Sequence, residues 1–157
     1  MGRSLRIALV TGSLVALVVA GSTVATNGNR KVLDATLAGI PSSLAGQVFM
    51  GATGGGLPWR LDAGMAKLWS DGRLVVKVEG LVFAAGPNEG RNTVPTGSAL
   101  VSCGGVVVAT SEAVPFSAEG DAEVATRVSL PSSCLAPVVF FAGNTGAGPR
   151  WFAVTGF

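Results

Sequence analysis

The chain has 157 residues, of which 48% are hydrophobic and 13% charged, and it contains neither histidine nor tyrosine. The absence of histidine excludes Ser-His-Asp and Cys-His catalysis and the common zinc-activated water sites. Arg3 and Arg6 account for the whole net charge of +2. The rest of the chain is neutral and has no basic run, which argues against binding to nucleic acid or to anionic membrane surfaces.

Residues 1–25 have the pattern of a secretory signal peptide. Arg3 and Arg6 precede an apolar run over residues 7–20, and small residues follow it, which is the order of segments in export signals. The run is shorter than the roughly 20 residues of a spanning helix, although an uncleaved anchor is the alternative. We expect cleavage after Ala25, with Ala20 and Ser22 as alternative points. We expect the cleaved protein to be secreted and to have no stable membrane span. The cell envelope is one of the locations at which we expect it.

After the leader, residues 26–31 form a polar linker, and residues 32–157 are expected to form one domain. Residues 32–37 predict a first strand, whereas 39–58 are rich in Gly, Ser and Pro and predict an irregular connection. The clearest signal lies between residues 66 and 83, where apolar and charged residues alternate on both sides of Asp71-Gly72. This pair predicts a two-residue hairpin turn.

Short apolar runs continue to the end of the chain. They cover residues 100–109, 124–130, 138–142 and 151–154, and Gly104-Gly105 interrupts the first of them. No window after the leader has helical periodicity over ten residues or more, and turn residues recur at about ten-residue spacing. The pattern predicts an all-β fold, an antiparallel β-sandwich that is immunoglobulin-like or small barrel-like, with about seven to nine strands.

Cys103 and Cys134 are the only two cysteines. In a small exported domain, such a pair is most simply one disulfide. The alternatives are a catalytic thiol or a soft-metal ligand, and both need partner residues such as histidine.

Acidic residues are the remaining candidates for a metal site. Glu119, Asp121 and Glu123 alternate ahead of a predicted strand, and hard cations such as calcium take oxygen ligands from clusters of this kind. A turn with exposed acids is the favoured interpretation, so no metal and no cofactor are predicted. The glycine-rich stretches 51–56 and 143–148 lack the Lys-Ser/Thr ending and the helix of a phosphate loop and indicate turns.

One loop stands out as a candidate contact surface. Residues 56–62 carry Trp59, Arg60 and Asp62, and an exposed tryptophan beside charged loop residues is typical of surfaces that stack on sugars or bind proteins. We therefore predict a ligand-binding role for these three residues and assign no catalytic residue.

Several short segments of the sequence resemble those of a known group of proteins. GLPWRLDAG, SDGRLVVKVEGLV, VSCGG, PFSAEGDAE, LPSSCLAPVVFFAG and WFAVTGF occur in this order between residues 56 and 157. Together they resemble a group of small, uncharacterised exported proteins from actinobacteria. The resemblance implies an exported all-β domain with one disulfide, and it implies no activity.

These observations lead to one main hypothesis, a secreted non-catalytic β module that binds or structures an envelope glycan, a matrix or an extracellular protein. One alternative is a carboxylate-dependent hydrolase of extracellular polysaccharide, with Asp62 as the first acid to test. Another is a secreted protease inhibitor that presents a rigid loop to a protease.

Overall fold

The computed structural model describes residues 29–156, so the predicted signal peptide lies outside the described residues. The described chain is all-β, as the apolar alternation predicts, and contains no helix. Within residues 29–156, no helix has the length and apolar character needed to cross a membrane. Thirteen strand segments follow one another along the chain. Their bounds are β1 Lys31–Gly39, β2 Val48–Phe49, β3 Ala52–Thr53, β4 Trp59–Arg60, β5 Ala63–Trp69, β6 Arg73–Glu79, β7 Val82–Phe83, β8 Thr96–Cys103, β9 Val106–Thr110, β10 Val114–Pro115, β11 Ala122–Arg127, β12 Val138–Asn144 and β13 Pro149–Thr155.

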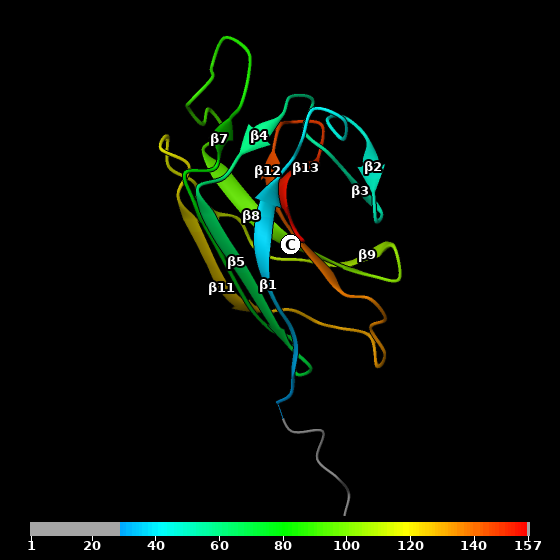
Figure 1. Ribbon diagram of the computed structural model, residues 1–157. Helices are drawn as coiled ribbons and strands as arrows, with labels where there is room; N and C mark the ends of the chain where they lie inside the picture. The colour runs from blue at the N-terminus through cyan, green and yellow to red at the C-terminus, as the bar shows by residue number, and fades with distance from the viewer. Residues whose placement is uncertain (1–28, 157) are drawn as a thin grey trace, which may run out of the picture.

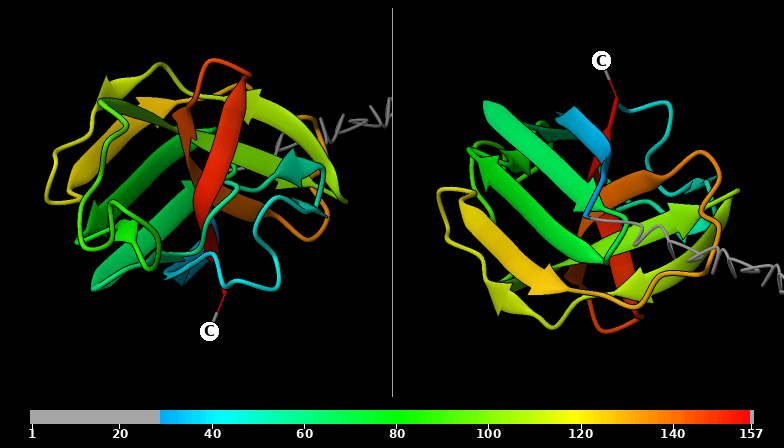
Figure 2. Two further views of the ribbon diagram at one scale, coloured as in Figure 1. Left: turned by 90° about the horizontal axis from the view of Figure 1, so that it is seen from above. Right: turned by 90° about the horizontal axis from the view of Figure 1, so that it is seen from below.

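Most of these strands form one curled antiparallel sheet, in the order β10-β8-β12-β13-β1-β5-β6-β11, and β9 pairs with β8 beside this path. The short strands β2–β3 and β4–β7 form two separate pairs. β1 produces the curl because its residues 31–36 pair with β5, whereas Leu37–Gly39 pair with the end of β13. The sheet therefore folds into two layers, with β1, β5, β6 and β11 in the first and β8, β12 and β13 in the second (Figures 1 and 2).

β1 begins at Lys31, which the sequence pattern placed in the linker. Lys31 pairs with Trp69 in the sheet, and its ammonium group lies 2.6 Å from Asp34 Oδ2 and 5.8 Å from the centroid of the Trp69 ring. These contacts explain why the strand can begin at a charged residue.

The β5–β6 hairpin forms where the alternation predicts it, but its turn differs from the predicted two-residue type. The amide of Gly72 donates to the Trp69 carbonyl over 2.9 Å, so Ser70 and Asp71 occupy the centre of the turn. Gly72 follows in the left-handed region at φ +83°. A three-residue loop of this kind needs glycine at that third position. A Cβ there would also lie 2.0 Å from the Val128 carbonyl oxygen.

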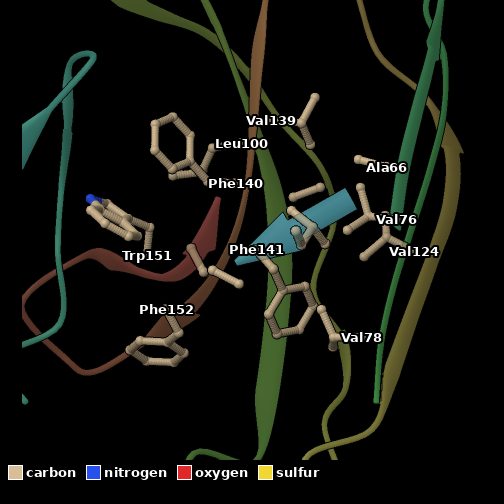
Figure 3. Packing of buried hydrophobic residues seen from close by; sticks show 14 of the residues in the cluster. Ala66, Val76, Val78, Leu100, Val124, Val139, Phe140, Phe141, Trp151 and Phe152 are labelled. Carbon is tan, nitrogen blue, oxygen red and sulfur yellow. The ribbon is translucent and has the colours of Figure 1, made fainter. Parts of the chain in front are cut away.

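The core fills the space between the two layers. In β5 and β6 buried residues alternate with half-buried or exposed ones, and in β11 the buried Val124 lies between two exposed residues, as expected for strands with one face in the core. Figure 3 shows that Val139 and Phe141 point from the second layer towards the first, whereas Phe140, Leu100 and Trp151 point away from it. The first-layer side chains that face Val139 and Phe141 in Figure 3 are Ala66, Val76, Val78 and Val124.

The irregular segment 40–58 covers the outer face of the second layer. The Trp151 indole N–H donates to the Ala52 carbonyl over 3.1 Å, and the Phe49 ring lies 6.4 Å from Phe140 between centroids. The Gly55 amide donates a hydrogen bond to the Trp151 carbonyl over 2.9 Å. The glycine-rich composition of this segment therefore serves close backbone packing over large aromatic residues.

Cys103 and Cys134 form the predicted disulfide, with 4.9 Å between their Cα atoms. The bond connects the end of β8 to the loop that precedes β12. Disulfides are typical of oxidising compartments such as the outside of the cell.

Candidate functional site

The structure places the three predicted contact residues in different environments. Trp59 is only 3% exposed, so it offers no stacking face to a ligand, and this part of the prediction is wrong. Its ring lies in the core because three phenylalanine rings surround it, with Phe152 and Phe83 at 4.0 and 4.1 Å between centroids and Phe116 at 6.3 Å. Arg60 and Asp62 lie at the surface, where Arg60 Nη1 is 3.1 Å from Asp62 Oδ1.

Asp62 belongs to an open groove of about 700 Å³ over the end of β6 and the start of β11, which we call the acidic groove. Its charged lining residues are Asp62, Lys77, Glu79, Glu119, Asp121 and Glu123. The Lys77 ammonium group lies 2.6 Å from Glu79 Oε1, and this hydrogen bond raises the pKa of Lys77. The lysine stays protonated at neutral pH and offsets part of the negative charge.

The predicted acid cluster within this groove stabilises a turn. Asp121 Oδ1 accepts a hydrogen bond from the Gly80 amide over 2.9 Å, and the Asp121 amide donates to Ser117 Oγ over 3.1 Å. Gly120 donates to the Ser117 carbonyl and has φ +94°. In residues 29–156, no three side chains of the types that bind metals come together to hold an ion. Asp121 therefore fastens the segment before β11 to the end of β6.

Charged residues are distributed very unevenly over the two layers. The strands β5, β6 and β11 carry Lys67, Arg73, Lys77, Glu79, Glu123 and Arg127. By contrast, β2, β3, β8, β9 and β12 carry no charged residue. The stretches 35–59, 92–111 and 128–149 contain none either. Arg150 of β13 is the only charged strand residue in β8, β12 and β13, and we call the part of the molecule formed by β2, β3, β8, β9 and β12 the uncharged side.

Three turns converge at one end of the uncharged side. A Cβ on Gly51 would lie 2.6 Å from the Gly105 carbonyl oxygen, which places the β2–β3 turn against the β8–β9 turn (Figure 1). The Gly104 amide donates to the Leu135 carbonyl over 2.7 Å and brings the disulfide loop to the same place.

The three most exposed large hydrophobic residues lie on or beside these turns. Leu135, Val48 and Val106 are 75%, 69% and 63% exposed, and Phe49 is 37% exposed. We call Val48, Phe49, Val106 and Leu135 the apolar tip. The largest apolar patch on the surface of a soluble protein is often a binding site.

Sequence reasoning missed the apolar tip, although a signal was present. The three uncharged stretches are visible in the chain, but they are separated by charged segments. Only the fold brings residues 48–51, 104–106 and 135 together.

No protein-family model, curated protein or solved structure matches this chain.

Proposed function

We propose that this protein is an exported, non-catalytic module that binds or structures an extracellular partner through its uncharged side. The observation that carries the proposal is that the β8–β9 turn touches both the β2–β3 turn and the disulfide loop, that these segments carry exposed apolar side chains, and that the neighbouring strands carry no charge. Burying such a surface against a partner is favourable because it removes apolar area from water without desolvating an ion.

Export is supported by two independent features. The order of segments in residues 1–25 is that of a secretory leader. The disulfide between Cys103 and Cys134 fits an oxidising compartment. Components of the cell envelope, matrix and extracellular proteins are therefore the partners that an exported protein can meet.

Binding is preferred over hydrolysis because the acidic groove does not shelter a proton donor. A general acid for glycoside cleavage needs a carboxyl group with a raised pKa, which burial usually provides. The Asp62 side chain is 68% exposed and is paired with Arg60. This carboxyl group is therefore open to water and is not buried in a pocket.

The test compares envelope association of the exported protein with that of two variants. Val106→Thr combined with Leu135→Gln removes apolar surface at the tip, and Leu57→Gln removes it from an exposed leucine elsewhere, beside Gly86. We expect the tip variant to move from the envelope fraction into the medium and the Leu57 variant to behave as wild type. Equal envelope association of all three folded proteins would overturn the proposed function.

A further inference from the structure

We infer that the partner of the apolar tip is an uncharged lipid layer, into which Val48, Phe49, Val106 and Leu135 insert reversibly. This inference rests on the proposed function because it takes the uncharged side as the binding surface. It goes further by naming the chemistry of the partner, namely acyl chains below headgroups without net charge.

The shape and size of the tip favour a soft partner over a second copy of the chain. The tip consists of three turns along one side of the molecule, with the β8–β9 turn between the β2–β3 turn and the disulfide loop (Figure 1). Four partly exposed side chains offer about half or less of the roughly 800 Å² that each partner buries in a standard protein interface. A lipid layer needs no complementary surface because its chains rearrange around each inserted side chain.

The charge distribution also favours lipid without net charge. Residues 92–111 and 128–149, which supply two of the three turns, contain no charged residue, and neither do residues 35–59, which supply the third. Insertion therefore desolvates no ion, and the tip offers no basic group that would select anionic headgroups.

The backbone at the tip is partly satisfied within the protein. The Gly104 amide is bonded to the Leu135 carbonyl, and the Met50 carbonyl accepts a hydrogen bond from the buried Ser102 hydroxyl over 2.7 Å. Because unpaired backbone groups are costly in an apolar medium, these two bonds lower the cost of insertion.

The disulfide holds the tip in one arrangement. Cys134 immediately precedes Leu135, and its bond to Cys103 keeps this leucine beside the β8–β9 turn. A surface that is ordered before binding loses less conformational entropy when it binds.

The experiment measures flotation of the exported protein with phosphatidylcholine vesicles, which carry no net charge. Wild type and Leu57→Gln are expected to float equally. Val106→Thr combined with Leu135→Gln should lower the vesicle partition coefficient by about tenfold to a hundredfold, since it replaces two apolar side chains with polar ones. Binding should not weaken when salt is raised, because no ion pair contributes. Circular dichroism and intact mass confirm that each variant is folded and oxidised.

Three outcomes would overturn the lipid inference. Absence of wild-type flotation, with envelope association still dependent on the tip, would reject lipid and leave the proposed function with a glycan or protein partner. Flotation that disappears in high salt would assign binding to the charged side. Light scattering that shows a wild-type dimer and a monomeric tip variant, without flotation, would assign the tip to self-association.

Discussion

The rings of Trp59 and Phe152 stack with 4.0 Å between their centroids and 13° between their planes. Phe83 packs against Trp59 at a centroid distance of 4.1 Å. The stack joins the short strand β4 to the last strand, β13, so a residue predicted to bind a ligand instead holds two distant segments of the chain together.

Trp59→Ala should therefore act on stability. We expect it to lower the free energy of unfolding by about 3–5 kcal/mol, the usual cost of removing a large buried aromatic side chain. Urea denaturation followed by circular dichroism measures the change. Arg60→Ala is the control from the same short strand, and because Arg60 is exposed its effect should stay within about 0.5 kcal/mol. A Trp59→Ala protein with wild-type stability would contradict the packing.

The positions of the long strands could be predicted from the sequence because each has one buried and one exposed face. In β6, Leu74, Val76 and Val78 alternate with exposed or half-buried residues, which is the signal that an alternating pattern detects. The short pairs β2–β3 and β4–β7 have two residues per strand. A period cannot be recognised over two residues, so these pairs depend on tertiary contacts.

The turn at Asp71-Gly72 shows a second limit of prediction. The residue types favour both a two-residue and a three-residue loop, and the choice depends on distant partners. The Val128 amide donates to the Gly72 carbonyl over 2.9 Å, and Arg127 bonds the Asp71 carbonyl over 2.6 Å. Neither contact can be derived from the local sequence.

The candidate site was predictable only in part. The disulfide followed from cysteine count, and Arg60 with Asp62 was correctly placed in a surface segment. The burial of Trp59 depends on rings contributed by Phe83, Phe116 and Phe152. These rings come from three separate segments, which no local pattern relates to Trp59.

Asn92 is a second test of the architecture, since it is one of two buried polar residues in the described chain. Its side-chain amide donates to the carbonyls of Val94 and Ser117 over 2.8 Å each and accepts from the Val94 amide over 2.8 Å. Asn92→Asp keeps the acceptor and loses both donors. We expect a loss of about 2–4 kcal/mol in unfolding free energy, because two partly buried carbonyls lose a partner beside a buried charge.

Urea denaturation at neutral pH measures this loss. The matched control is Asn88→Asp, an amide-to-acid change at an exposed position of the preceding loop, where the free energy of unfolding should change by less than about 0.5 kcal/mol. Equal effects at the two positions would show that Asn92 does not hold residues 94 and 117 together.

The disulfide should stabilise the fold by restricting the unfolded chain. Its two cysteines are 31 residues apart, and the chain-entropy relation gives about 3.5 kcal/mol for a loop of that length. Cys103→Ser combined with Cys134→Ser should lower the free energy of unfolding by this amount. Wild-type protein that is reduced and alkylated serves as the comparison and should lose a similar amount. Unchanged stability in both would show that the bond does not constrain the unfolded chain as proposed.

The contacts of Asp71 predict that the free energy of unfolding depends on pH in the acidic range. The Arg73 amide, which donates to Asp71 Oδ1 over 3.1 Å, and then the Arg127 guanidinium, which lies 2.9 Å from Asp71 Oδ2, lower the pKa of the Asp71 carboxyl below its ordinary value. A group whose pKa is lower in the folded than in the unfolded state stabilises the fold above its unfolded pKa. This contribution is lost as the pH falls through the lower, folded pKa.

The stability difference between wild type and Asp71→Asn should therefore be present at neutral pH and shrink in acid, below the ordinary pKa of an aspartate. Urea denaturation at a series of pH values from neutral to strongly acidic measures it. In Arg127→Met the Arg73 amide still holds the carboxylate, so a smaller part of the same dependence should remain. A difference that stays constant over the whole series would show that ionisation of Asp71 does not stabilise the β5–β6 turn.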